Sequence, residues 1–176
     1  MKSLPLRQRE RAAASVAVLI RSPLWRVAGL RPAQTARRAA RAALAACETA
    51  SPADVTVALS DDTELRELNH MWRGKDRPTN VLAFPAGSVP VGRRPPLGDV
   101  ILAFETVAQE AEAADLALSH HLSHLVVHGV LHLLGYDHEK PAEARRMEDL
   151  EVRVLAGLGI ADPYAALPPL RRLGKR

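Results

Sequence analysis

His128-Gly-Val-Leu-His132-Leu-Leu-Gly135-Tyr-Asp-His138 is the most informative stretch of this 176-residue chain. His128 and His132 are four residues apart, so on a helix they lie on one face, one turn apart. Gly135 can adopt a positive φ, which ends the helix and lets the chain bring His138 back toward them. Three neutral imidazoles with an open fourth position suit a hydrolytic zinc ion. The stretch therefore predicts one Zn²⁺ on a helix and the turn that follows it.

Six of the seven histidines fall within nineteen consecutive residues, so the ligands must be selected from several candidates. His124 and His132 are eight residues apart, about 12 Å along a helix, which is too far for one ion with Zn–N bonds of about 2.0–2.1 Å. His124 and His128 could pair, but the turn at Gly135 lies beside His132. The best ligand set is therefore His128, His132 and His138. Three roles then stay open for His124: support of the metal ligands, contact with substrate, or ordinary packing.

Metzincin proteases share this spacing of histidines, with a glutamate general base directly after the first one. In this chain Gly129 stands at that position. Asp137, next to a predicted ligand, could act as a base instead, or could orient a ligand. A zinc metallohydrolase acting on peptides or small molecules is therefore an alternative rather than the leading interpretation.

A second cluster of charge, Arg73-Gly-Lys75-Asp-Arg77, places three cations within five residues. A trihistidine site keeps the full charge of its metal and favours an anionic substrate. Cleavage of a phosphodiester also needs a donor such as arginine for the charge that develops on the phosphate. The segment is a candidate phosphate clamp, and a solvated surface loop is the alternative.

The composition, 47% hydrophobic with 3% aromatic residues, predicts one domain with a core of Leu, Val and Ala. Cys47 is the single cysteine and cannot form an internal disulfide, which suits a reducing cytoplasm. No apolar stretch approaches the roughly 20 residues of a membrane helix, so no membrane partner is expected. These features predict a cytoplasmic protein.

The charge is distributed unevenly along the chain. Residues 1–47 carry ten Lys or Arg and one acid, a net charge of +9. The last seven residues add +4, so the overall charge of +4 leaves −9 for residues 48–169. Basic ends on an acidic body suggest an anionic partner such as nucleic acid, with solvated faces as the alternative. We expect a basic leader at 1–14, a single domain at 15–165 and a basic tail at 166–176.

Hydrophobic periodicity and turn residues give the order of the elements. Strands are predicted at 15–20, 54–60, 80–84 and 99–104, and helices at 32–46, 62–72, 105–117, 119–135 and 141–156. Asp61 or Asp62 and Ser119 are the expected N-caps of two of these helices. The order predicts an α+β fold, in which a small mixed β-sheet of about four strands packs with helices around the metal helix.

These residues resemble the YbeY family of bacterial metal-dependent endoribonucleases, from about Asp54 to Tyr164 and more weakly back to Ser15. The histidine stretch matches the signature of that family. Three further segments are similar: Arg73-Gly-Lys-Asp-x-Pro-Thr-Asn-Val-Leu, Gly98-Asp-Val-Ile and Leu158-Gly-Ile-x-Asp-Pro-Tyr. There are two departures: Ala83 replaces the serine usual before Phe-Pro, and the basic leader and tail exceed the family core.

The resemblance implies a single-domain α+β fold with one zinc ion on His128, His132 and His138, and a functional arginine at Arg73. It also implies single-strand-specific cleavage of RNA in the maturation of the 3′ end of 16S rRNA, and ribosome quality control. The expected partners are therefore single-stranded rRNA and the ribosome or its small subunit. His124 or Asp137 is expected to handle protons. A non-catalytic ribosome assembly factor with a closed, four-ligand structural zinc is a further alternative.

Overall fold

A four-stranded mixed sheet forms the centre of the molecule, with strand order β1-β2-β4-β3. The computed structural model describes residues 14–27, 29–47, 54–87, 96–138 and 140–165. The strands are β1 (Val16–Ile20), β2 (Asp54–Ser60), β3 (Val81–Pro85) and β4 (Pro96–Ala103). β1, β2 and β4 run parallel, and β3 pairs antiparallel with β4 at the edge. β4 is central because its run Val100-Ile-Leu102 is apolar on both faces and is buried on both.

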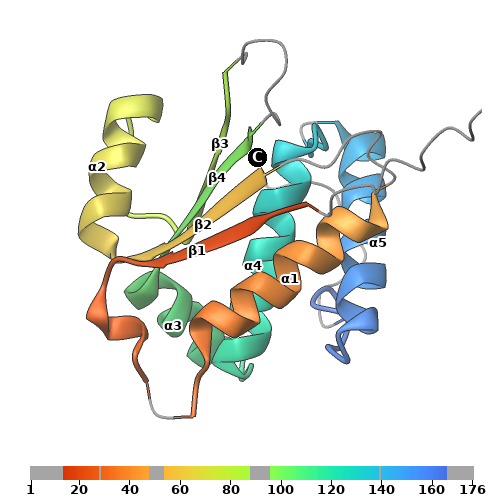
Figure 1. The fold of residues 1–176 in the computed structure, drawn as a ribbon, viewed down its shortest axis with the longest axis horizontal. Coiled ribbons are helices and arrows are strands. Elements are labelled where there is room, and N and C mark those ends of the chain that lie inside the picture. Colours follow the sequence, from red (N-terminus) through yellow and green to blue (C-terminus); the bar gives the residue numbers. More distant parts are fainter. Residues whose placement is uncertain (1–13, 28, 48–53, 88–95, 139, 166–176) are drawn as a thin grey trace, which may run out of the picture.

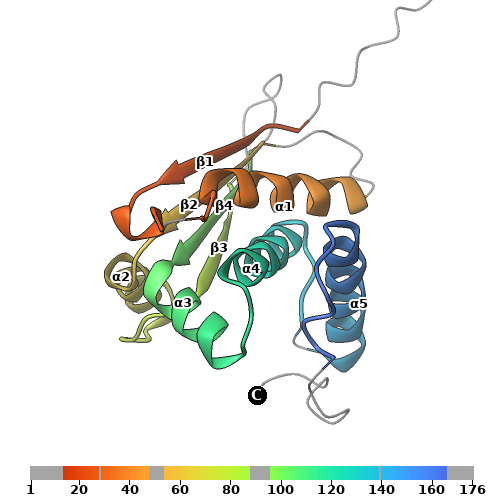
Figure 2. The same ribbon diagram turned by 90° about the horizontal axis from the view of Figure 1, so that it is seen from below.

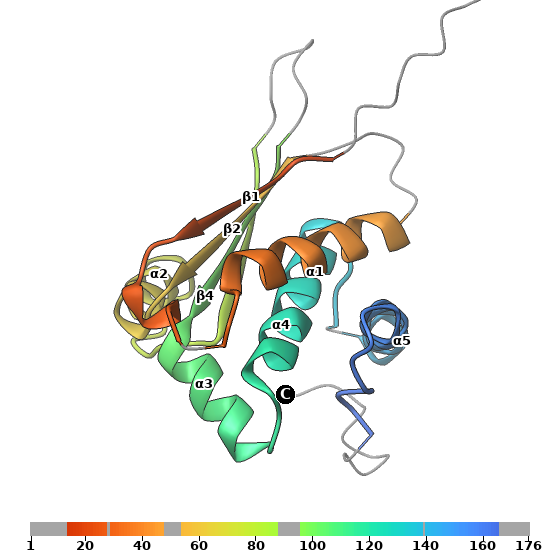
Figure 3. The same cartoon turned by 60° about the horizontal axis from the view of Figure 1, so that its bottom comes forward.

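The helices divide unequally between the two faces of the sheet. They are α1 (Pro32–Ala46), α2 (Asp62–Arg73), α3 (Phe104–Ala113), α4 (Leu118–Leu133) and α5 (Pro141–Gly157), and a short 3₁₀ turn covers Pro23–Trp25. Figure 1 and Figure 2 show α1 and α4 on one face, with α5 packed outside them, and α2 on the other face. α3 leads from the end of β4 to the start of α4 (Figure 3). The long histidine-bearing helix is thus enclosed between the sheet and α5.

Each face of the sheet has its own hydrophobic cluster. The larger one lies under α1, α4 and α5, and includes Val57, Val100, Val126 and Leu155. The smaller one lies under α2 and consists of five buried residues, Ala58, Leu65, Leu82, Ile101 and Ala103. The expected core of Leu, Val and Ala is found, although the largest fully buried side chain is Trp25, which donates from Nε1 to the carbonyl oxygen of Ser60 at 2.7 Å.

The structure confirms the α+β class, the mixed four-stranded sheet and the predicted order of elements. Asp61 is the N-cap of α2, accepting from the Glu64 amide at 3.2 Å. The Ser119 cap is wrong: α4 begins at Leu118 after Ala117, because Leu118 already packs against the core, so Ser119 lies inside the first turn.

The two largest differences from the predicted bounds are the end of a helix and the start of a strand. The helix expected to reach residue 117 ends at Ala113, because Asp115 has a φ of +53°, which a helix cannot accommodate. The strand expected from Asp99 begins at Pro96, since residues 96–98 continue the pairing with β2. The proposed leader and tail fall almost entirely at 1–13 and 166–176, outside the described residues. In the part of the chain that is described, no helix is long and apolar enough to cross a membrane.

Candidate metal centre

α4 lies unusually close to the sheet at the point where the site begins. Gly129 follows the first histidine, and a Cβ atom placed there would lie 2.5 Å from Cγ1 of Val100 on β4. A side chain of any size would therefore push the helix off the sheet. This packing explains why the protease-type glutamate has no place after His128 in this fold.

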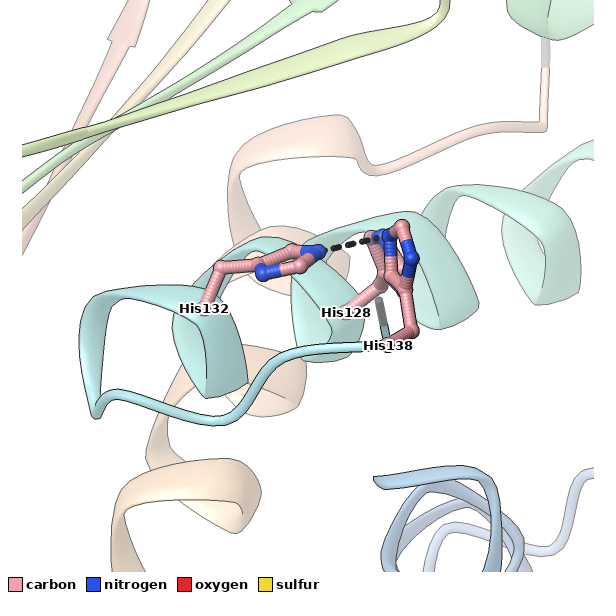
Figure 4. Close-up of side chains that lie close together, drawn as sticks. All are labelled: His128, His132 and His138. Carbon is pink, nitrogen blue, oxygen red and sulfur yellow. Dashed lines mark hydrogen bonds between the residues drawn. The ribbon is translucent and has the colours of Figure 1, made fainter. Parts of the chain in front are cut away.

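Three imidazoles meet beside the C-terminal half of α4 (Figure 4). His128 and His132 project from successive turns of the helix, and their Nε2 atoms are 3.0 Å apart. α4 ends at Leu133, and Gly135 adopts a φ of +89° that turns the chain back. This turn brings the ring of His138 to 4.9 Å from that of His132, centroid to centroid. One nitrogen from each histidine lies within 4.8 Å of the others, so these three residues could hold a metal ion.

The hydrogen bonds of the other ring nitrogens fix which atoms face the site. Nδ1 of His132 lies 3.0 Å from the carbonyl oxygen of Tyr136, and Nδ1 of His128 lies 2.8 Å from Oε1 of Glu151. Both partners are acceptors, so both Nδ1 atoms must donate. In the neutral rings, the two Nε2 atoms therefore present lone pairs to each other at 3.0 Å. A proton or a metal ion between the rings would satisfy these lone pairs, and the convergence of a third imidazole, that of His138, favours a divalent metal.

A buried carboxylate supports this arrangement from α5. Glu151 is 1% exposed and accepts hydrogen bonds from His128, from Nε2 of His124 at 3.2 Å, and from the hydroxyl of Tyr164. Burial opposes its ionisation, but the hydrogen bonds and charges of the two histidines outweigh burial and lower the pKa of Glu151 to about 2. Burial and the adjacent Glu151 raise the pKa of Tyr164, which stays a donor. The carboxylate is therefore ionised and fully engaged.

His132 is held in the neutral form that a metal requires. Burial, followed by the charges of His128 and His138, lowers its pKa to about 4. Near neutral pH its Nε2 atom carries no proton and can bind a metal without competition.

The three histidines open onto a cleft of about 550 Å³ between α4 and the edge strand β3. Arg73, the last residue of α2, reaches this cleft from the other side of the sheet. Asp137 also lines it, and its Oδ1 accepts from the backbone N–H of His138 at 2.6 Å. The site thus combines possible metal ligands with one cation and one carboxylate in an open groove.

The sequence-predicted residues are therefore largely brought together. His128, His132, His138, Arg73 and Asp137 all line the cleft. His124 does not: its ring lies against Glu151 and Tyr164, 6.5 Å from the ring of His128, centroid to centroid. The position of His124 favours a supporting role over contact with substrate.

The sequence reasoning missed Glu151 and gave Tyr164 no role. A signal for Glu151 was present, because it lies on the same helical face as Ala144, Met147, Val154 and Leu155, all of which are buried. A charged residue on an apolar face of a helix indicates a partner in the interior. The identity of that partner could not be read from α5 alone.

Comparisons with known proteins show the family to which the chain belongs. Residues 27–159 match the family model described as Endoribonuclease YbeY. The chain is 57% identical over 136 residues to Endoribonuclease YbeY of Azorhizobium caulinodans, covering 76% of this chain and 86% of that protein. It is 47% identical over 156 residues to Endoribonuclease YbeY of Bradyrhizobium diazoefficiens, covering 86% of this chain and 85% of that protein.

A solution structure of a Thermotoga maritima protein has the same fold. The two structures align with a TM-score of 0.52 at 24% identity, over 92% of this chain and 99% of the other. The match to the family model covers both the histidine stretch and the Arg73 segment. The chain therefore belongs to the YbeY family of endoribonucleases.

Proposed function

We propose that this protein is a zinc-dependent endoribonuclease that cleaves single-stranded RNA during rRNA maturation, with the ion held by His128, His132 and His138. The observation that carries the proposal is the convergence of three imidazoles at the wall of an open cleft, with the Nε2 atoms of His128 and His132 3.0 Å apart. Family membership supports RNA as the substrate. Neutral nitrogen ligands with an open position favour zinc over the oxygen-seeking Mg²⁺ and Ca²⁺.

The residues of the chain divide the chemistry between them. A bound zinc ion would supply positive charge toward the scissile phosphate and acidify a water molecule. Arg73 binds the phosphate and stabilises the charge that develops on its oxygens. Asp137 faces the same cleft, and only its Oδ1 is engaged among the described residues, so Oδ2 can accept a proton. Glu151 orients His128, and His124 holds Glu151 in place.

The biological setting follows from the same proposal. The substrate is the 3′-end region of 16S rRNA, the partner is the ribosome or its small subunit, and the compartment is the cytoplasm, where these molecules are found. We further propose that residues 15–165 form the single catalytic domain, with residues 1–14 and 166–176 as basic extensions. The high positive charge of the N-terminal 47 residues and of the last seven supports contact with RNA.

The two alternatives are less favoured by particular features of the site. A metzincin-type peptide hydrolase needs a carboxylate after His128, and Gly129 packs too closely on Val100 for one. A structural zinc site is closed by four protein ligands, whereas the three histidines here open onto a cleft that contains Arg73.

The test uses the purified full chain with single-stranded and duplex fragments of the 3′ end of 16S rRNA, with and without a chelator. We expect cleavage of the single strand, little cleavage of the duplex, and loss of both on chelation. Casein is digested in parallel, and the coordination number of the metal is measured by X-ray absorption. Casein cleavage without RNA cleavage, or four protein ligands around the metal, would contradict the proposal.

A further inference from the structure

Trp72, on the last turn of α2, is an aromatic side chain that folding leaves in solvent. It is 67% exposed, and its neighbour Met71 is 73% exposed. The only other tryptophan, Trp25, is fully buried. Single exposed apolar residues are common on protein surfaces, so exposure by itself assigns no role to Trp72. Its surroundings supply the further observations.

The ring of Trp72 is held in position on one side. It packs against Phe84 of β3, with ring centroids 5.8 Å apart and an angle of 58° between the planes. Phe84 belongs to the partly buried residues around the small cluster under α2. α2 has a well-defined C-cap, because Gly74 adopts a φ of +66° and its N–H donates to the carbonyl oxygen of His70 at 2.9 Å. The indole is therefore an ordered platform with much of its surface free.

The segment next to Trp72 is cationic and fixed in place. Asn69 donates to the carbonyl oxygen of Arg77 at 2.8 Å, and the carboxylate of Asp76 is already paired with Arg66. Within the described residues, no ion pair involves the side chain of Arg73, Lys75 or Arg77. Three positive charges therefore lie within five residues of the platform, and none has a counter-ion in the part of the chain that the structure describes. A polyanion is the partner that this charge favours.

The platform and the metal cleft lie on opposite faces of the edge strand β3, and Arg73, the residue after Trp72, reaches the cleft. Along β3, Val81, Ala83 and Pro85 line the cleft, whereas Phe84 faces α2 on the opposite side of the sheet. Because β3 is the edge strand, a flexible chain can leave the cleft past Arg73 and cross this edge onto the face of Trp72. The bases of a duplex are already stacked and paired, so a duplex offers no free base to this platform.

We propose that Trp72 is a stacking site for an unpaired RNA base that flanks the phosphate held in the cleft, with Lys75 and Arg77 contacting the adjoining backbone. This site deepens the proposed function and depends on it for the identity of the ligand. It provides a physical reason for a preference for single strands, since only unpaired bases can stack on the free face of an aromatic side chain.

The two tryptophans make a direct test possible. Trp25 is buried and gives a constant background, so quenching of fluorescence by RNA reports on Trp72. The full chain is titrated, in the presence of chelator so that RNA stays intact, with a ten-nucleotide single-stranded RNA and with the corresponding duplex. We expect saturable quenching by the single strand, and at least tenfold weaker quenching by the duplex. Trp72→Ala should bind the single strand about 5- to 150-fold more weakly, which corresponds to the loss of one stacked base.

Matched variants separate stacking from other roles. Affinities for the variants are measured by filter binding, with folding checked by circular dichroism. Trp72→Phe should keep the affinity of the wild type within about threefold, because a phenyl ring still stacks, and Met71→Ala should leave it unchanged. The stacking site is overturned if single-stranded RNA does not quench the fluorescence of Trp72. It is also overturned if Trp72→Ala binds RNA as tightly as the wild type, which is the result expected if this face contacts a protein instead. Equal losses for single strand and duplex would also overturn it. Quenching without any chelator-sensitive cleavage would instead reject the proposed nuclease while the RNA-binding site stands.

Discussion

The cleft has two walls, α4 with α5 behind it and the edge strand β3 with Arg73 of α2, and they differ in how far their polar groups are already satisfied. On the α5 side, Glu151 is 1% exposed and is engaged by His128, His124 and Tyr164. On the α2 side, Arg73 is exposed and has no ion-pair partner among the described residues. The first wall sets its geometry before any ligand arrives, whereas the second keeps its charge available. In the proposed function, holding a metal and holding a substrate therefore fall to separate parts of the fold, and each can be perturbed separately.

Loss of a histidine from the first wall should have the largest effect. His132→Ala removes one of the three possible ligands, so the protein is expected to lose its bound metal and its cleavage of RNA to background. Metal content is measured by elemental analysis, and cleavage with a single-stranded RNA fragment. His120→Ala, an exposed histidine at the start of the same helix, is the matched control and should change neither. Full metal content in His132→Ala would contradict the assigned ligand set.

Arg73 on the second wall should affect cleavage without affecting the metal. Arg73→Ala is expected to lower kcat by about 100- to 1,000-fold, the usual cost of one donor to a developing oxyanion. Metal content should stay at the level of the wild type. Arg73→Lys should recover part of the rate, because it keeps the charge but loses the planar, two-pronged contact. Arg145→Ala, an exposed arginine on α5, is the control. Loss of metal from Arg73→Ala would show that the two walls do not act independently.

Glu151 should affect the metal more than the substrate. Glu151→Gln keeps the shape of the side chain but removes the charge that orients His128, and is expected to weaken metal binding by about 10- to 100-fold. Competition with a chelator of known affinity measures this loss. With saturating metal, KM for RNA should stay close to that of the wild type. Asp149→Asn, two residues earlier and exposed, should leave the metal affinity unchanged. Unchanged metal affinity in Glu151→Gln would contradict the supporting role of Glu151.

Acid should destabilise the metal-free protein through His132 and Glu151. This is the smallest of the four expected effects. The pKa of His132 is about 4 in the folded state against 6.5 in a free side chain. Between these values the unfolded chain binds more protons, so the free energy of unfolding falls as pH falls from about 6.5 to about 4. Glu151, with a pKa of about 2 against 4.5, extends this fall below pH 4.5.

Urea midpoints at pH 7, 5.5 and 4.5, measured in chelator, follow this dependence. His132→Ala should show a shallower decline than the wild type between pH 6.5 and 4.5, and His120→Ala an unchanged one. Equal slopes in wild type and His132→Ala would mean that this histidine is not held neutral by its surroundings.

Local sequence determines more of the metal side of the cleft than of the substrate side. The spacing of His128, His132 and Gly135 encodes a helix face and a turn, and both depend on neighbouring residues only. The helix over 32–46 and the strand over 54–60 were predicted with the bounds the structure has, for the same reason. The start of α4 was not, because packing of the half-buried Leu118 against the core overrides the local preference of Ser119 for a cap position.

By itself, the sequence determined the class of fold, the order of the strands and helices along the chain, and the three histidines that face one point. Only the tertiary structure decided that Glu151 orients His128, that His124 lies behind the site, and that Arg73 reaches the cleft around the edge strand. The physical reason is range: periodicity and capping act over a few residues, whereas these contacts join separate elements. They exist only because burial of two hydrophobic faces of one sheet brings those elements together.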